Sequence, residues 1–307
     1  MISKLLVFIL IFLFSSRCGL PFLRKESQST HWEDLEAKYS KYAELSPKGQ
    51  DHWLSDLEEC DALLFYSLAH AGLANDPADL RDFERSPGEM LRRPDVASRC
   101  GSSISRDMLL GVFVHAYVYK DLELLERIWE YGSGHMWKMG MVYDINADNL
   151  GKVMLSPQLI GLLARLIYHL GGDNHEISRA LPAFYTYAGG GFRDHLNLLQ
   201  IYLEGRIAEQ LSEKQVEYLR KLVEENTGNT LAQALLRQYT DGNMSIPINQ
   251  LLDIWPDNRL PNSEEDWKEP WRPQRADSDA GLRPGLPRIE HSGGDFLFIS
   301  AIILEKI

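Results

Sequence analysis

The sequence predicts an all-α fold, an α/α toroid in which an outer ring of helices surrounds an inner ring. From about Thr30 onward the hydrophobic periodicity is helical, and no long alternating run bounded by turn residues indicates a sheet. The helices are of two kinds: some have a polar face, whereas others are apolar on nearly all sides. The two kinds roughly alternate along the chain, as expected if short connections join inner and outer neighbours. We therefore expect one domain spanning residues 30–307, with a complete or an incomplete ring.

The first 18 residues have the order of an export signal. Lys4 is followed by an uncharged apolar run, residues 5–14, and then by small residues and Arg17-Cys18. At about 1.5 Å per residue this run is too short to cross a hydrocarbon core of about 30 Å. We predict a protein exported to the periplasm, the cell surface or the medium, with residues 19–29 as a tether.

Cys18 lies where bacterial lipoproteins carry their lipid-modified cysteine, and the segment resembles such signals. Arg17 departs from the small residue usual before that cysteine, so cleavage and lipidation both stay open. Contact with a membrane is expected only through the signal or such an anchor. If Cys18 is removed or modified, Cys60 and Cys100 remain as an even pair in an oxidising compartment. They form either two buried thiols or a disulfide contributing about 3–4 kcal/mol.

The charge balance narrows the class of partner. With 44 acidic and 32 basic side chains, the chain has a formal net charge of -12. Such a chain repels phosphates, and no lysine-rich stripe offsets the field. Nucleic acid is therefore not an expected partner.

Each predicted helix is assigned to one kind by its apolar pattern. The amphipathic helices are expected over residues 32–42, 121–131 and 213–225. A helix that lacks a polar face must be surrounded either by protein or by lipid. Five predicted helices are of this kind, and because they are too short to span a membrane we expect them inside the protein. These apolar helices are expected over residues 62–73, 108–119, 159–170, 196–203 and 296–304.

Acidic residues recur where the apolar helices begin. Asp107, Asp194 and Asp295 each follow a loop of small residues, and Asp61 immediately precedes another apolar helix. Glycines permit close approach of the backbone to a ligand, and a helix N-terminus offers free amides and a positive dipole end. If the inner helices are parallel, these acids meet at one rim. Ordinary N-capping, at about 1 kcal/mol, is the better explanation for any single aspartate, and the recurrence beside glycines, arginines and histidines is what favours a shared rim.

Residues 255–288 have a different composition, rich in proline, tryptophan and charge, without a helical period. A loop of this length inside a domain is usually a lid, a binding loop or disordered. Trp255, Trp267 and Trp271 argue against simple disorder. Their rings either pin the loop to the core or stack on a ligand, and Trp271 is our candidate for stacking.

The acidic helix starts suit hydrolysis of a glycosidic bond. That reaction needs one protonated carboxyl group and one ionised carboxylate on either side of the bond. We predict Asp61 as general acid and Asp107 as base, with Asp295 as the third candidate. The side chains predicted to bind substrate are Arg106, Arg193, His195 and His291, together with Trp271.

Alternating helices, aspartates at inner-helix starts and a long aromatic loop resemble the α/α-toroid glycosidases and polysaccharide lyases over roughly residues 30–307. The resemblance implies a polysaccharide or cell-wall glycan as substrate and carboxylates as catalytic groups. It is architectural, without a diagnostic motif. A lyase would need a tyrosine or histidine base and an arginine or asparagine that neutralises a uronate carboxylate. Tyr187 and His195 are available as the base, and Arg193 as the neutralising cation.

The sequence lacks the common metal-binding and nucleotide-binding motifs. No His-Glu-x-x-His or paired Cys-x-x-Cys occurs, so no metal is predicted, and no nucleotide-binding fingerprint suggests a cofactor. The competing class is a helical scaffold or binding lipoprotein without chemistry, in which the polar helix starts are ordinary caps. That class predicts that the acids lie far apart and that replacing them affects stability alone.

Overall fold

The computed structural model describes residues 26–45, 62–75, 79–92, 104–139, 153–181, 193–225, 229–240, 248–255, 257 and 293–307. Most of these residues are helical, which confirms the all-α class. The longer helices are α2 (Glu26–Leu45), α3 (Ala62–Leu73), α4 (Arg106–Tyr119), α5 (Leu122–Gly134), α6 (Pro157–His169), α8 (Arg193–Ala208), α9 (Glu213–Glu225), α10 (Thr230–Tyr239) and α13 (Gly293–Ile303). The shorter ones are the 3-10 helix η2 (Leu80–Phe83), α7 (Glu176–Arg179) and α11 (Ile248–Ile254).

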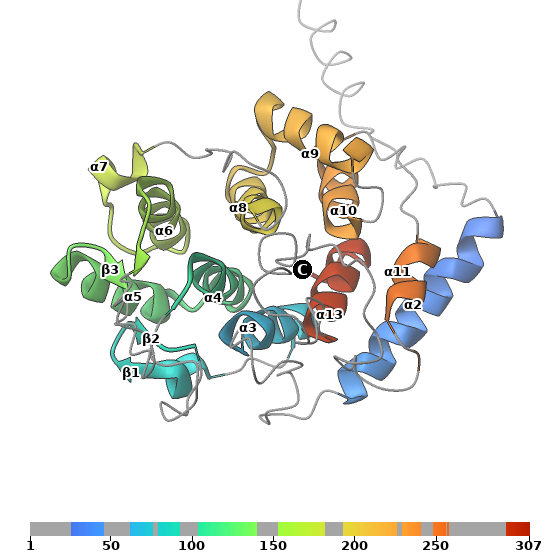
Figure 1. Ribbon diagram of the computed structural model, residues 1–307, viewed down its shortest axis with the longest axis horizontal. Helices are drawn as coiled ribbons and strands as arrows, with labels where there is room; N and C mark the ends of the chain where they lie inside the picture. Colours follow the sequence, from blue (N-terminus) through green and yellow to red (C-terminus); the bar gives the residue numbers. More distant parts are fainter. Residues whose placement is uncertain are drawn as a thin grey trace, which may run out of the picture.

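Two short antiparallel strand pairs accompany the helices. Strand β1 (Glu84–Ser86) pairs with β2 (Glu89–Met90), with Glu84 opposite Met90. Strand β3 (Lys138–Met139) pairs with β4 (Val153–Met154), with Lys138 opposite Met154. Both pairs lie beside α5, at the edge of the helical layer (Figure 1).

Local sequence signals set several helix starts. Ser156 caps α6 by accepting a hydrogen bond from the backbone amide of Leu159, and proline follows at the first helical position. Asp121 caps α5 through the amide of Leu124, at 3.1 Å, and Asn229 caps α10 in the same way. Asp121 was predicted as the first residue of its helix and is instead the residue before it.

Five helices pack pairwise around a common centre. Helix α3 contacts α4 and α13, α4 contacts α8, and α10 contacts both α8 and α13. Figure 1 shows these five helices arranged around the end of the chain at Ile307. Four of them carry the segments expected to be apolar on all sides, and their buried residues, among them Leu64, Phe113 and Phe298, belong to one hydrophobic core.

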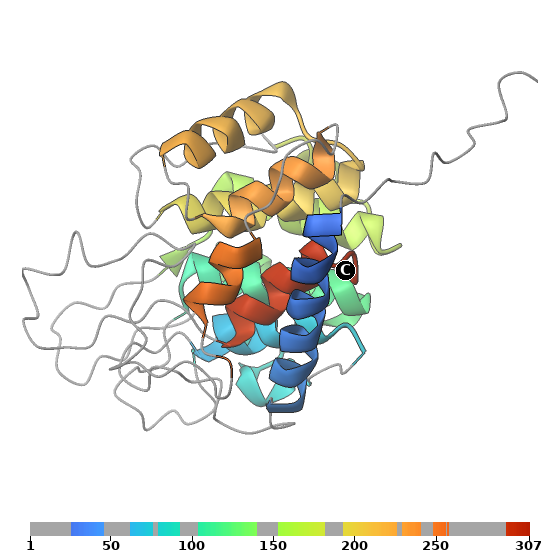
Figure 2. The same ribbon diagram turned by 90° about the vertical axis from the view of Figure 1, so that its right-hand side faces the viewer.

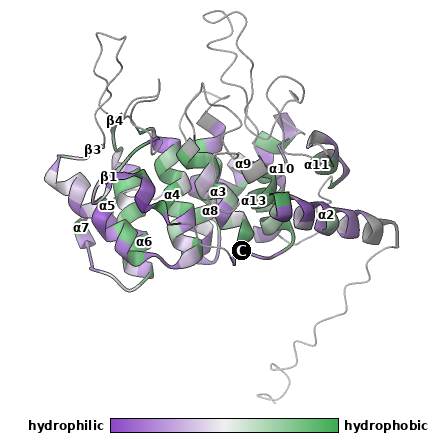
Figure 3. Ribbon diagram, turned by 90° about the horizontal axis from the view of Figure 1, so that it is seen from below, coloured by the Kyte–Doolittle hydropathy of each residue, from purple (hydrophilic) through white to green (hydrophobic). Residues whose placement is uncertain are grey.

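The amphipathic helices lie outside this layer. Helix α2 packs on α13 and α11, and Figure 2 shows α2 and α11 side by side. It buries Leu35, Tyr39 and Tyr42, while much of its remaining surface is polar and coloured purple in Figure 3. Helix α9 packs on α10, with Leu219 and Leu222 of the predicted stripe buried. Helix α6 contacts α4, α5, α7 and α8, and it exposes Tyr168 and His169, so the prediction that residues 159–170 are apolar on all sides was wrong.

Close backbone contact joins α3 to α13. A Cβ atom at Gly72 would lie 2.5 Å from the backbone carbon of Leu297, so only glycine fits there. The hydroxyl of Tyr39 donates a 2.7 Å hydrogen bond to the carbonyl of Gly72, which adds α2 to the same contact. The absence of a side chain at one position therefore lets two core helices pack at backbone distance.

Several predicted features lie outside the described residues. These are the signal at 1–18, the start of the tether, Cys60 and Cys100, and nearly all of the 255–288 loop. Trp255 is described: it is buried and its ring lies 5.5 Å from that of Phe296, so this tryptophan packs against the core. Within the described ranges, none of the helices has the length and hydrophobicity needed to cross a membrane.

Candidate functional site

The ends of the core helices define two opposite sides of the layer. Residues from the C-terminal turns of α8, α10 and α13 line a single pocket, which indicates that the starts of these helices share the other side. The start of α4 meets the start of α8, because Asp107 and His195 are in contact. Helices α3 and α4 are also parallel, since Tyr119 near the end of α4 donates to the carbonyl of His70 near the end of α3.

Asp107 is the centre of a buried polar group at the start of α4. His195 Nε2 lies 3.3 Å from Asp107 Oδ2, and the hydroxyl of Ser105 donates to Asp107 Oδ1. The side chains of Asp107 and His195 are 1% and 0% exposed. Ser105 is the N-cap residue of α4, but its hydroxyl bonds the carboxylate rather than a helix amide. Asp107 therefore makes a tertiary contact with α8 in addition to any effect on its own helix.

A second polar group fixes the first turn of α8 to α9. Tyr218 donates a 2.5 Å hydrogen bond from its hydroxyl to Asp194 and accepts one from the Asn197 side chain at 3.0 Å. Burial and the hydrogen bond to Asp194 raise the pKa of Tyr218. Asn197 is fully buried and Asp194 nearly so. Because His195 is the neighbour of Asp194, this group restrains the turn that carries the histidine.

Three other predicted site residues lie at the starts of core helices. Asp295 lies in the first turn of α13 and is fully buried, and Arg193 begins α8. Arg106 begins α4 and is exposed. The structure thus brings together Asp107 and His195. The other predicted site residues lie outside the described residues: Asp61, His291 and Trp271, as does Tyr187.

Sequence reasoning missed Ser105 as a partner of Asp107, and it missed Tyr218 altogether. Tyr218 lies in a charged amphipathic helix, on a side whose residues predict contact with solvent. Only its hydrogen bonds to Asp194 and Asn197 reveal its role. Ser105 stood in the small-residue loop that was singled out, but a serine before a helix predicts a cap.

A pair of histidines is buried between α3 and α4, away from these polar groups. His115 is 1% exposed, and neither ring nitrogen has a hydrogen-bond partner among the described residues. Burial lowers the pKa of His115 to about 3, and the proximity of His70 adds to the effect. The ring of His115 packs 4.7 Å from that of Tyr119. These contacts make the histidine a neutral member of the core.

The described residues contain no group of three or more histidine, cysteine, aspartate or glutamate side chains able to hold a metal ion. Comparison with known proteins finds no matching family model, no matching curated protein and no matching solved structure. The assignment of a function therefore depends on the geometry of the site alone.

Proposed function

We propose that this protein is an exported glycan-degrading enzyme, a glycoside hydrolase with the helices of an α/α toroid. The inner ring would comprise α3, α4, α8, α10 and α13, whose contacts close a cycle, and the outer helices would include α2, α5 and α9. The observation that carries the proposal is the buried contact of Asp107 with His195 where α4 and α8 begin. A polysaccharide or cell-wall glycan is the proposed substrate.

The contacts of Asp107 support an acid–base role. Ser105 and His195 each hold one oxygen of the carboxylate, which fixes its orientation. In hydrolysis the Asp107–His195 pair would take a proton from the attacking water. A second, protonated carboxyl group would donate to the leaving oxygen. We assign that role to Asp61 and place Asp295, in the first turn of α13, beside the substrate.

The positions of the acids also favour this function over a scaffold protein. Asp107, Asp194 and Asp295 all lie in the first turns of core helices, and all three are buried. Surface capping would leave such side chains in water. Burying a carboxylate is costly unless other groups hold it, so three buried acids at helix starts need a reason beyond helix stability.

The same contact favours a second candidate, a polysaccharide lyase. An imidazole oriented by a carboxylate is a suitable base for removing the proton next to a uronate carboxyl group. In that reaction His195 would take the proton and Asp107 would orient the ring. Arg193, at the start of the same helix, would neutralise the uronate. The aspartates in α8 and α13 have no task in this scheme.

A screen of the protein lacking residues 1–18 against soluble glycans and cell-wall material tests the proposal. New reducing ends without ultraviolet absorbance indicate hydrolysis, whereas absorbance of an unsaturated sugar near the cleavage site indicates elimination. The variant Asp107→Asn should lose the activity. A folded protein that degrades none of these glycans, or an Asp107→Asn variant as active as wild type, would exclude this site as the catalytic one.

A further inference from the structure

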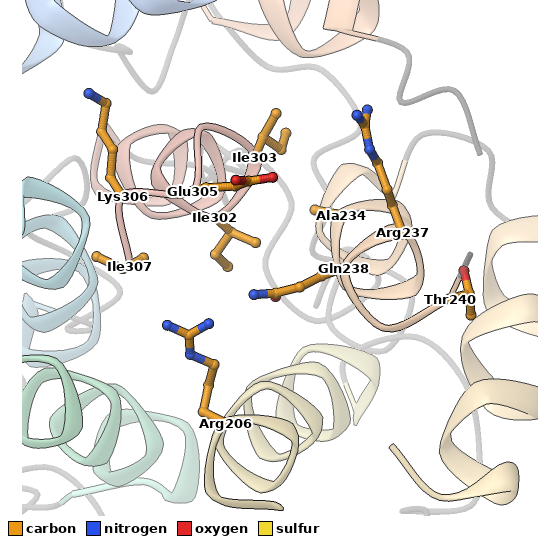
Figure 4. A pocket seen from close by; sticks show the side chains of 10 residues that line it. All are labelled: Arg206, Ala234, Arg237, Gln238, Thr240, Ile302, Ile303, Glu305, Lys306 and Ile307. Carbon is orange, nitrogen blue, oxygen red and sulfur yellow. The ribbon is translucent and has the colours of Figure 1, made fainter. Parts of the chain in front are cut away.

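A pocket of about 560 Å³ lies at the C-terminal ends of α8, α10 and α13, on the side opposite the proposed catalytic residues. Arg206 enters it from α8, Gln238 from α10, and Ile302 and Glu305 from the end of α13 and the residues after it. Figure 4 shows the guanidinium of Arg206 and the amide of Gln238 directed toward each other across this space. The volume falls within the range of small-molecule sites.

Arg206 differs from two other partly buried arginines, Arg127 and Arg165. Arg127 pairs with Glu84, and Arg165 pairs with Glu204. Among the described residues no carboxylate lies within ion-pair distance of Arg206, which is partly buried. A partly buried guanidinium without a counter-ion is costly, because its planar set of donors is suited to a carboxylate or another oxyanion.

The side chains beside Arg206 belong to three tyrosines. The guanidinium lies 5.9 Å from the centre of the Tyr202 ring and is hydrogen-bonded to the hydroxyl groups of Tyr117 and Tyr239. Burial alone would lower the pKa of Arg206, but these three tyrosines raise it overall. Burial in turn raises the pKa of Tyr239 to about 12. Burial also raises the pKa of Tyr202, so Tyr202 and Tyr239 stay protonated at neutral pH and carry no negative charge to offset Arg206.

The other two cations of the pocket contact α2. Arg237 lies over the ring of Trp32, 5.0 Å from its centre, and Lys306 lies 3.6 Å from Glu36. In Figure 4 both side chains extend away from Arg206. The carboxylate of Glu305 stands across the pocket from Arg206, in an exposed position. Arg206 is thus the cation that a ligand in this pocket would meet.

The C-terminal ends of helices carry partial negative charge, which by itself favours an arginine in a last turn. That effect explains a positive residue on α8, and it holds equally for Arg237 on α10. It does not explain why Arg206 lies beside a pocket, faces an amide and lacks a carboxylate. From these contacts we infer that the pocket is an anion-binding site. Arg206 and Gln238 hold the carboxylate, sulfate or phosphate group of a small ligand.

The inference is independent of the proposed catalytic function, and direct binding measurements test it. The probes are sodium sulfate, sodium phosphate and sodium glucuronate, titrated into the protein lacking residues 1–18, with sodium chloride at equal ionic strength as reference. Arginine side-chain Nε–H signals and calorimetry follow the binding. We expect saturation in the millimolar range and a higher thermal midpoint than in chloride. Sulfate and phosphate report a free inorganic anion, whereas tighter binding of glucuronate indicates a sugar acid.

Three variants assign the binding to this pocket. Arg206→Gln should weaken binding at least tenfold, and Glu305→Gln should strengthen it, because it removes the acid facing Arg206. Arg220→Gln, an exposed arginine of α9 outside the pocket, should bind as wild type does. If Arg206→Gln fails to fold, Gln238→Glu places a repelling charge in the pocket and should abolish binding. Equal responses of wild type and these pocket variants, or no saturation by any probe, would overturn the inference.

Discussion

Asp107 and His195 are 88 positions apart in the sequence, and in the structure His195 Nε2 lies 3.3 Å from Asp107 Oδ2. The contact joins the first turns of α4 and α8, and both side chains are excluded from solvent. A buried carboxylate–imidazole pair of this kind can accept a proton, orient a ring or simply hold two helices together. Substitutions that keep the shape but change the charge separate these roles.

Asp107→Asn should lower the turnover of a glycan that the screen shows to be degraded by about 10²- to 10⁴-fold, which is the usual contribution of acid–base catalysis. Asparagine keeps an acceptor oxygen for Ser105 and removes the negative charge beside His195. The thermal midpoint should stay near the wild-type value, as circular dichroism would record. Asp173→Asn changes an exposed aspartate and serves as the control. A large loss of stability with normal turnover would assign the pair a purely structural role.

The predicted ranges match most of the longer helices because burial imposes a pattern on every turn, but none of them covers α10 (Thr230–Tyr239). Helices α3 and α9 have the predicted bounds, Ala62–Leu73 and Glu213–Glu225. Helices α4 and α8 begin two and three residues before the predicted apolar segments. The first turn of each helix contains an arginine and an aspartate, and we had assigned these residues to the preceding loops. Acidic side chains are in fact favourable in a first helical turn, because its backbone amides are free.

The candidate site was only partly predictable from the sequence. Asp107 and His195 were both selected, but for separate roles, because no periodicity reveals that two helix starts meet. Tyr218 and Arg206 were missed, since each follows the ordinary pattern of its helix. Tyr218 acquires its role from Asp194 and Asn197 on α8, and Arg206 acquires its role from the pocket that α8 forms with α10 and α13.

His115 should make the protein sensitive to acid. Its pKa is about 3 in the folded protein and 6.5 in a solvated chain, so between these values the unfolded chain binds more protons. Stability from this group is complete above about pH 6.5 and is lost as the pH falls toward 3. The slope is about 1.4 kcal/mol per pH unit at most. Denaturant unfolding of wild type and His115→Phe from pH 7 to pH 4 measures this loss.

The phenylalanine variant should show a smaller decrease in unfolding free energy with acid than wild type. His169→Gln, which changes an exposed histidine, should keep the wild-type slope. Parallel curves for wild type and His115→Phe would mean that the buried imidazole contributes nothing to acid unfolding.

Tyr218→Phe should destabilise the protein by about 1.5–3 kcal/mol, because it removes a hydrogen bond to a nearly buried carboxylate. It should also reduce turnover, since Asp194 adjoins His195 and the hydroxyl holds that turn of α8. Chemical denaturation and glycan assays measure the two effects. Tyr168→Phe, at an exposed tyrosine, should change neither. Unchanged stability of Tyr218→Phe would show that water replaces the hydroxyl without cost.

Glycine-to-alanine substitutions at two helical positions should have opposite effects. At Gly72 the new Cβ atom would lie 2.5 Å from the backbone of Leu297, so α3 and α13 would have to separate. We expect a loss of about 1–3 kcal/mol, as for other overpacked cores. At Gly134, the last residue of α5, a Cβ atom meets nothing within 4 Å.

Gly134→Ala should stabilise the protein by about 0.4–1 kcal/mol, because alanine restricts the unfolded chain. The two variants add the same methyl group, so their difference isolates the contact between α3 and α13 from helix propensity. Urea unfolding curves of both proteins and wild type provide the comparison. A Gly72→Ala protein as stable as Gly134→Ala would contradict the close backbone packing on which this part of the core depends.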